Sequence, residues 1–544
     1  RIEQELENEK KKEEDEEKQR AEEFEYRFPR INSIWGLRRI VKWMYREGWI
    51  YSFGLIFLLI VSSILILSIS SKYIGNDESN YIYTSILIHE GKVPFKDFIT
   101  RAPPLIYTLS LFFYFFPLKL ISLKIFLIIL FLLTIIFVYL INKLTFTKKT
   151  SIISIVLLLL TKFIYLWYIV ASTIQLNILF IVSGIYFIIL NIRSNKTIHL
   201  VLGTLLLSLA FYTRSLSSLV FFTLFFILSL VKKDIRYSIK FCILSLIFVL
   251  ILPLYFYIQL GFWKALSILT GAGAINKTES LVPLSVSIFN LKTGLTLTMN
   301  LLIFGLISLM LILKERKLTK LIPFVSIFLP LTLFYGWYLS KRGFFLGYYY
   351  EIIISTIFLI PFFIQYLVKN KQKIIILMVV TLIISANFIL PIFLFPSRAE
   401  ILSEGLDVSR IIGSGVKKST LTDVSNYIRK VTSPNETIFS SNLQWSIESE
   451  RRQFLDLTHT LAYEEGTEIN ELFNIHTRDE IKNKLINSEV NLVVYDNHFD
   501  LSFSFLNDII EDKFLRCKDF ENKISIYVRK DIDLPKYECN VNQN

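Results

Sequence analysis

Cysteine, histidine and glycine are scarce in this chain of 544 residues, which has 3 Cys, 5 His and 19 Gly. No Cys or His pair has the spacing of a structural zinc site, so that class of site is excluded. A composition with 47 Phe and only 19 Gly is typical of helical membrane proteins rather than of soluble enzymes. Cys242 falls in an apolar run, whereas Cys517 and Cys539 fall in a polar region. The latter two form a disulfide in an oxidising compartment or remain free thiols, and the sequence leaves both open.

Long apolar runs recur along about two thirds of the chain, and 53% of the residues are hydrophobic. Each run is long enough to cross a hydrocarbon core of roughly 30 Å. A soluble fold would have to bury nearly every helix on all sides, which excludes that class. The net charge of +13 does not indicate nucleic-acid binding, because the basic residues cluster in short loops where they set membrane orientation.

The loop charges predict the topology. Arg38, Arg39, Lys42 and Arg46 precede the first run and predict a cytoplasmic N-terminus. All later basic loops share that side only if residues 104–118 do not cross but form an interfacial or re-entrant helix on the outer face. The predicted spans are 50–70, 122–142, 151–170, 175–192, 198–213, 216–231, 238–258, 295–313, 321–339, 349–368 and 373–395.

The expected fold is therefore a polytopic α-helical membrane protein with about 11 transmembrane helices, an outer interfacial helix and a small C-terminal α/β domain. Residues 1–48 are predicted to be a charged cytoplasmic tail. Residues 49–396 form the transmembrane domain, in which 71–121 is the first outer loop. Residues 397–544 form the extracytoplasmic domain, with strands expected at 437–440, 490–495 and 524–529.

Two adjacent carboxylates, Asp77 and Glu78, follow the first span on the predicted outer face. Glycosyl transfer from a lipid phosphate needs a carboxylate to deprotonate the acceptor, and cations to hold the departing phosphate. Asp77 is the candidate base and Glu78 assists or orients it. The candidate phosphate ligands are Arg101, Arg214, Lys341 and Arg342, and the candidate substrate contacts are Tyr81, Asp97, Tyr348 and Tyr349.

Most of these candidates have a structural alternative. Asp77-Glu78 is also compatible with a solvated loop pair, and the basic residues with anchors at the lipid headgroups. Tyr348 and Tyr349 belong to a cluster that is more typical of an aromatic belt at the membrane interface than of a substrate site. The asparagines of the Asn276-Lys277-Thr278 and Asn435-Glu436-Thr437 triplets match glycosylation sequons, which also occur by chance.

The first-loop pattern resembles the GT-C fold membrane glycosyltransferases, in the branch of the protein O-mannosyltransferases and lipid A aminoarabinose transferases. The similar segments are Asp77-Glu78 with Tyr81, Gly91 with Pro94–Phe98, and Arg101–Tyr107. Weaker similarities are Leu209–Arg214 and Gly347–Tyr350.

The resemblance implies an inverting transferase that uses a polyprenyl- or dolichyl-phosphate sugar on the outer face, with Asp77 as its catalytic carboxylate. Arg101 corresponds approximately to the basic residue before the family's proline. Ser172–Asn177 departs from relatives that carry a second acid in the next outer loop. The absence of a Trp-Trp-Asp sequence argues against oligosaccharide transfer onto asparagine.

The predicted function is thus sugar transfer to a protein, lipid or glycan acceptor by a multi-pass protein of the cell membrane. The expected partners are the lipid-linked sugar, the acceptor and membrane lipids, with no nucleic acid. No cofactor is required by the pattern; Mg²⁺ or Mn²⁺ is an open alternative, although one acidic pair seldom completes an oxygen site. The rival functions are a transporter or flippase of lipid-linked sugars, for which the expected internal repeat is not evident, and a purely structural assembly protein.

Overall fold

The computed structural model describes most of the helical part and most of the C-terminal sheet. The described residues are 49–70, 73–74, 76–100, 103–116, 120–159, 173–213, 218–232, 235–261, 303–314, 322–326, 348–369, 416–458, 475–487, 490–496, 503–520 and 524–539, with 15, 19, 168, 264 and 499.

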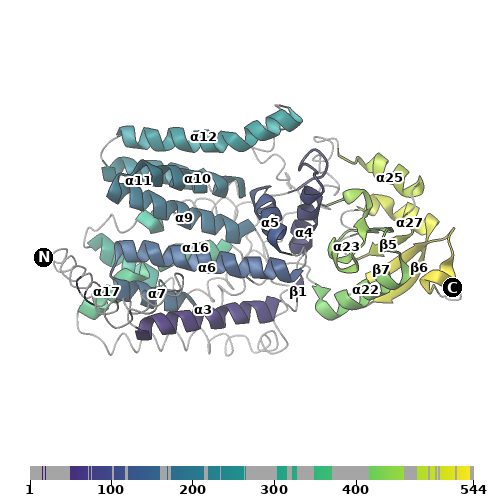
Figure 1. The fold of residues 1–544 in the computed structure, drawn as a ribbon, viewed down its shortest axis with the longest axis horizontal. Coiled ribbons are helices and arrows are strands. Elements are labelled where there is room, and N and C mark those ends of the chain that lie inside the picture. Colours follow the sequence, from purple (N-terminus) through teal and green to yellow (C-terminus); the bar gives the residue numbers. More distant parts are fainter. Residues whose placement is uncertain are drawn as a thin grey trace, which may run out of the picture.

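A bundle of apolar helices makes up one half of the molecule (Figure 1). Three of the described helices are long and apolar enough to cross a membrane: Ile121–Thr145, Thr173–Ser194 and Ile235–Leu260. The helices are α3 (Trp49–Ser70), α6 (Leu120–Thr145), α7 (Lys148–Leu159), α9 (Thr173–Ser194), α10 (Thr197–Thr213), α11 (Ser218–Lys232), α12 (Ile235–Leu260), α16 (Tyr348–Ile357) and α17 (Ile360–Lys369). A further helix covers Ile303–Lys314.

The helix bounds agree with several predicted spans, including 50–70, 122–142 and 175–192, to within about three residues. Within the predicted span 349–368, a turn at Phe358 and Leu359 separates α16 from α17, a break that the sequence analysis did not predict. Pro361 explains the break: its nitrogen carries no hydrogen and its ring clashes with the carbonyl four residues earlier. The span 373–395 lies outside the described residues, and the total of eleven stays a prediction.

The last turns of α6 and α9, which carry Lys143 and Arg193, meet at one end of the bundle. Arg193, in the last turn of α9, donates a hydrogen bond to the carbonyl of Leu144 at the end of α6. Figure 1 places this end away from the C-terminal sheet. Helices α9 and α10 approach closely, since a Cβ on Gly184 would lie 2.8 Å from Cγ of Leu207. Such small residues are typical of packed membrane helices.

Two shorter helices, α4 (Asn76–His89) and α5 (Pro103–Phe115), lie between the bundle and the sheet (Figure 1). The 13 residues of α5 extend over about 20 Å, which is too short to cross a hydrocarbon core. That residues 104–118 lie on the outer face without crossing stays a prediction. Nε2 of His89 lies 2.7 Å from the carbonyl oxygen of Ser110 and so links α4 to α5.

The C-terminal part contains a five-stranded mixed sheet in the order β4-β3-β5-β7-β6. Strand β3 is parallel to β4 and β5, whereas β7 is antiparallel to β5 and β6. The predicted strands at 437–440 and 524–529 coincide with β3 and β7. The strands are β3 (Thr437–Ser440), β4 (Arg452–Gln453), β5 (Leu492–Tyr495), β6 (Phe514–Phe520) and β7 (Ile524–Arg529). The helices are α22 (Lys418–Val431), α23 (Gln444–Ser449), α25 (Arg478–Asn487) and α27 (Asn507–Lys513), with 3-10 turns η4 (Phe454–Asp456), η6 (Ser504–Leu506) and η8 (Leu534–Tyr537).

A disulfide joins Cys517 in β6 to Cys539 beyond η8, with their Cα atoms 4.5 Å apart. It resolves the alternative that the sequence left open. A two-stranded pairing between β1 (Tyr73–Ile74) and β2 (Val416–Lys417) also connects the residues after α3 to the start of the C-terminal part. The start of the first loop is therefore in contact with the start of the C-terminal part.

Candidate functional site

The first turn of α4 carries the adjacent acids predicted from the sequence. Asp77 is the second residue of this helix, where the helix dipole favours a carboxylate, and its side chain lies outside the described atoms. Glu78 is fully buried, and Nζ of Lys124 donates hydrogen bonds to both of its carboxylate oxygens, at 2.6 and 2.8 Å. Lys124 is itself only 1% exposed and belongs to α6. The pair fixes the start of α4 against the bundle.

Lys124 was not among the predicted site residues. A buried charge needs a partner, because an unpaired ion in a low-dielectric interior is strongly unfavourable. A single Lys within a long apolar run is the signal that could have revealed it. Its partner lies 46 residues earlier in the chain, and no local pattern connects the two.

The remaining predicted residues fall into two groups. Tyr81 is 7% exposed and packs in the main hydrophobic core, whereas Asp97 is exposed and accepts a hydrogen bond from the Val93 N–H at 2.7 Å. Tyr348 and Tyr349 form the first turn of α16, and their side chains lie outside the described atoms. Those wholly outside the described residues are Arg101, Arg214, Lys341 and Arg342.

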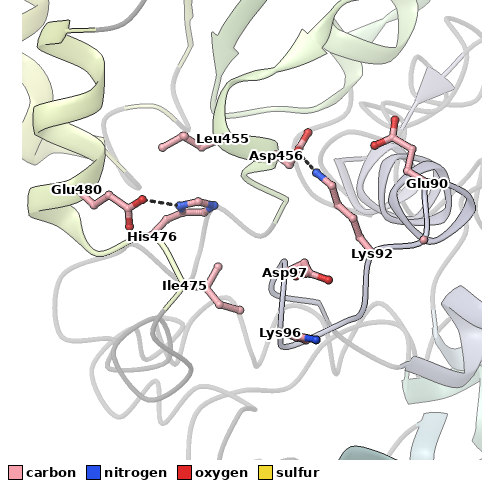
Figure 2. A pocket seen from close by; sticks show the side chains of 10 residues that line it. Glu90, Lys92, Lys96, Asp97, Leu455, Asp456, Ile475, His476 and Glu480 are labelled. Carbon is pink, nitrogen blue, oxygen red and sulfur yellow. Dashed lines mark hydrogen bonds and ion pairs between the residues drawn. The ribbon is translucent and has the colours of Figure 1, made fainter. Parts of the chain in front are cut away.

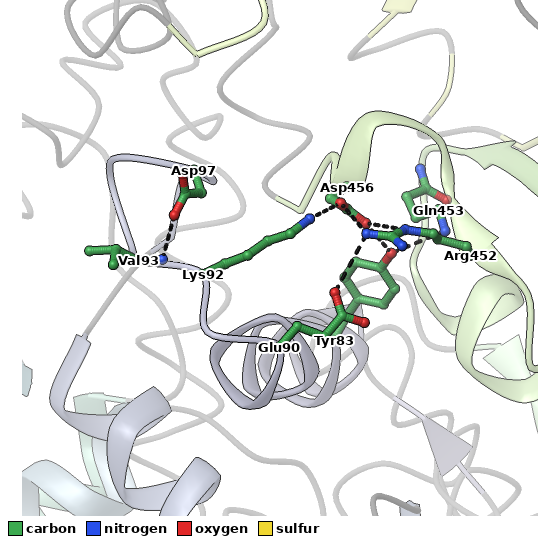
Figure 3. Close-up of polar contacts among 8 residues, drawn as sticks. All are labelled: Tyr83, Glu90, Lys92, Val93, Asp97, Arg452, Gln453 and Asp456. Atoms are coloured by element: carbon green, nitrogen blue, oxygen red, sulfur yellow. Dashed lines mark hydrogen bonds and ion pairs between the residues drawn. The ribbon is translucent and has the colours of Figure 1, made fainter.

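A polar network joins the far end of α4 to the C-terminal sheet through Asp456 (Figure 3). Tyr83 donates its hydroxyl hydrogen to Oδ1 of Asp456 at 2.8 Å and accepts the Gln453 N–H at 3.1 Å. Lys92 forms an ion pair with Asp456, and Nη2 of Arg452 lies 3.0 Å from Oδ2 of the same carboxylate. The network thus bridges positions more than 360 residues apart in the chain.

The electrostatics of this network favour the charged form of Asp456. Burial acts to raise the pKa of the carboxyl, but hydrogen bonds from Arg452, Lys92 and Tyr83 outweigh it, so the pKa lies below its ordinary value. Burial, followed by the negative charge of Asp456, raises the pKa of the Tyr83 phenol. Tyr83 therefore stays protonated and remains a donor at neutral pH.

Apolar contacts accompany the network. Tyr83, Leu87 and Phe98 of the first loop form a buried cluster with Leu443, which precedes α23. Near the start of α4, Oγ of Ser79 lies 3.4 Å from Oδ1 of Asn442. Thr458 donates a hydrogen bond to the carbonyl of Ile99. The C-terminal part therefore holds α4 along its length, and the position of Asp77 depends on both halves of the molecule.

A pocket of about 550 Å³ opens beside the network (Figure 2). One wall is the turn after α4, and the other comes from η4 and the residues that lead into α25. Four lining residues, Gly91, Leu455, Asp456 and His476, have positive φ values between 49° and 83°. For the three that are not glycine this conformation costs on the order of 1–3 kcal/mol each and concentrates at functional sites. The lining residues are Glu90, Gly91, Lys92, Lys96, Asp97, Leu455, Asp456, Ile475, His476 and Glu480.

Among the described residues, no three His, Cys, Asp or Glu side chains come together as metal ligands. The described part of the chain therefore provides no set of ligands for Mg²⁺ or Mn²⁺, which the sequence left open as a cofactor.

Comparison with known proteins identifies the fold. Residues 100–257 match the family model of the dolichyl-phosphate-mannose-protein mannosyltransferases. The chain also superposes on the crystal structure of ArnT from Cupriavidus metallidurans bound to undecaprenyl phosphate, with a TM-score of 0.57 over 87% of this chain and 98% of that chain, at 10% identity. The chain has a GT-C glycosyltransferase fold.

Other GT-C structures are less similar. The apo oligosaccharyltransferase of Archaeoglobus fulgidus gives a TM-score of 0.49, at 14% identity over 82% of this chain and 70% of that one. The AglB protein from the same organism, in complex with an inhibitory peptide and a dolichol-phosphate, gives 0.47, at 12% identity over 90% of this chain and 76% of that one. No curated protein sequence matches the chain. The resemblance predicted from the first loop is thus confirmed for the fold.

Proposed function

We propose that this protein is an integral-membrane glycosyltransferase that moves a sugar from a polyprenyl- or dolichyl-phosphate donor to an acceptor on the outer face, with inversion. The observation that carries the proposal is the Asp77-Glu78 turn, held at the junction of a GT-C bundle and its C-terminal sheet. The family model and the undecaprenyl phosphate in ArnT support the class of donor.

In this mechanism the Asp77 carboxylate accepts the proton of the acceptor hydroxyl. The hydroxyl oxygen attacks the anomeric carbon from the face opposite the phosphate, and the bond from that carbon to the phosphate oxygen breaks. The lipid phosphate leaves with the electron pair. Cations stabilise its charge most strongly through charge-assisted hydrogen bonds. Arg101, Arg214, Lys341 and Arg342 are the proposed ligands of that phosphate.

Glu78 has an orienting role in this proposal. Its two carboxylate oxygens face Lys124, which holds the first turn of α4 while Asp77, the preceding residue, meets the substrate. Mg²⁺ or Mn²⁺ stays an open alternative as a cofactor of this reaction. Tyr81 is buried in the core and supports α4 from within, and Tyr348 and Tyr349 are proposed substrate contacts at the start of α16.

The outer-face location is also a proposal. The disulfide of the C-terminal part is typical of proteins in an oxidising compartment. The basic turns lie at the other end of the bundle, as expected for a cytoplasmic side with the N-terminus. The proposed domain limits remain 1–48, 49–396 and 397–544.

The test is sugar transfer by the purified full-length protein in lipid nanodiscs, with radiolabelled polyprenyl-phosphate sugars and a membrane extract as the acceptor source. We expect Asp77→Asn to lower the rate by about 10²–10⁴-fold, the usual contribution of a general base, without changing thermal unfolding. The control is Asp508→Asn, an exposed acid of α27 outside the site, which should keep the wild-type rate. Wild-type transfer by Asp77→Asn would refute the assignment. Lipid-linked sugar crossing the bilayer without any transfer would instead favour the flippase alternative.

A further inference from the structure

The Asn435-Glu436-Thr437 triplet has no part in the proposed reaction, and the fold places it where it can be modified. It lies at the turn between α22 and β3, in which Ser433, Pro434 and Asn435 are exposed. The Glu436 N–H donates a hydrogen bond to the carbonyl of Ser433 at 3.1 Å and closes this turn. The asparagine of the triplet is therefore accessible from solvent in the folded protein.

The turn is attached to the disulfide-bonded segment of the C-terminal part. Oε1 of Glu436 accepts a hydrogen bond from Nζ of Lys536 at 3.3 Å, and Oε2 accepts one from the Tyr537 hydroxyl at 3.3 Å. Two residues further along, Cys539 is joined to Cys517. Because Glu436 contacts this segment directly, the triplet and the disulfide share one compartment. A disulfide is typical of an oxidising compartment.

The triplet lies at the end of β3 that is remote from α4. Strand β3 begins at Thr437 and ends at Ser440. Just beyond its end, Oδ1 of Asn442 lies 3.4 Å from Oγ of Ser79 in α4. The four residues of the strand extend over about 13 Å between the two ends. A group bound to Asn435 is therefore attached at the opposite end of the strand from the first loop.

A second triplet of the same pattern, Asn195-Lys196-Thr197, lies in the helical bundle and provides a matched control. All three of its residues are exposed, at the end of α9 and the start of α10. The turn follows Arg193, which donates a hydrogen bond to the carbonyl of Leu144 at the end of the bundle proposed to face the cytoplasm. Both asparagines are thus exposed within the same sequence pattern, and the proposed membrane side is what differs.

We propose that Asn435 is an N-glycosylation site, which accepts a glycan from a lipid-phosphate-linked donor on the outer face. The amide nitrogen of Asn435 bonds to the anomeric carbon of the glycan. The bond from that carbon to the phosphate oxygen breaks, the lipid phosphate leaves with the electron pair, and one amide proton passes to a base of the transferring enzyme. Because this chain lacks a Trp-Trp-Asp sequence, the step is assigned to a separate enzyme. The inference shares the outer-face location with the proposed function, but not the reaction at Asp77.

The test is mass spectrometry of the full-length protein purified from membranes of its source organism. Digestion separates the peptides of Asn195 and Asn435 from that of Asn276, which lies outside the described residues. We expect a glycan on the Asn435 peptide and an unmodified Asn195 peptide. Thr437→Ala should abolish the modification, whereas Thr437→Ser keeps the triplet's pattern and should retain it. An unmodified Asn435, a glycan on Asn195, or a glycan that survives Thr437→Ala would overturn the proposal.

The membrane side is measured independently on the same protein. Asp508→Cys introduces a thiol at an exposed position of α27, and a membrane-impermeant maleimide is applied to intact cells. The wild-type protein is the control for labelling of Cys242. We expect the variant to be labelled in intact cells. Such labelling together with an unmodified Asn435 would reject the glycosylation site alone, whereas labelling only after lysis would reject the outer-face location and this proposal with it.

Discussion

The buried ion pair between Glu78 and Lys124 gives the sharpest prediction about the site. The two side chains are 0% and 1% exposed, and both oxygens of Glu78 lie within 2.8 Å of the same ammonium nitrogen. Lys124→Met removes one charge and takes the ammonium group away from the buried Glu78 carboxylate. Breaking such a pair costs about 3–5 kcal/mol, whereas replacing both members with apolar groups is often neutral or stabilising.

The assay is thermal unfolding of the purified protein in detergent, followed by tryptophan fluorescence, on the two single variants and the double variant. We expect Lys124→Met and Glu78→Leu each to lower the free energy of unfolding by about 3–5 kcal/mol. The double variant should recover most of that loss. Lys149→Met, an exposed lysine at the other end of the bundle, is the matched control and should stay within about 0.5 kcal/mol of wild type.

The same variants distinguish a structural role of Glu78 from a direct role in the reaction. If Glu78 only orients the first turn of α4, the stable double variant should retain measurable sugar transfer that still depends on Asp77. If Lys124→Met unfolds like wild type, or if the double variant is as unstable as the single ones, the account of the pair is wrong. A stable double variant without any transfer would assign Glu78 itself to the chemistry.

Three further outcomes are expected from the junction and the sheet. Tyr83→Phe should lower the stability of the docked C-terminal part by about 1–3 kcal/mol, because it leaves the buried Gln453 N–H unpaired, and hydrogen exchange of α4 should increase. The depressed pKa of Asp456 stabilises the fold above its unfolded value of about 3.8, and this contribution should be lost as the pH falls through the folded-state pKa. In Asp456→Asn that part of the acid dependence should disappear from the unfolding curves. Reduction of the Cys517–Cys539 disulfide should cost about 3 kcal/mol, and maleimide should label one cysteine before reduction and three after reduction and unfolding.

The sequence predicted those features that depend on local periodicity. Apolar runs of spanning length located α3, α6 and α9, and alternating strands located β3 and β7. The break between α16 and α17 was missed because the run is apolar throughout, although Pro361 marks it.

The sequence could not predict contacts between distant residues. Lys124 meets Glu78 only because α4 packs against the start of α6, and Asp456 meets Tyr83 and Lys92 only because the sheet docks on the first loop. The order of the five strands depends likewise on tertiary packing. Asp97 was predicted as a substrate contact from the first-loop pattern. The structure places Asp97 in the wall of the pocket, so substitution of this residue tests the prediction.

The most direct test of the central claim is single-turnover transfer from a radiolabelled polyprenyl-phosphate sugar by wild-type and Asp77→Asn protein at equal concentration in nanodiscs. The account predicts a labelled acceptor with the wild type and a rate about 10²–10⁴-fold lower for Asp77→Asn. It also predicts an inverted anomeric configuration in the product. Equal rates for the two proteins, or a product that retains the donor's configuration, would contradict it.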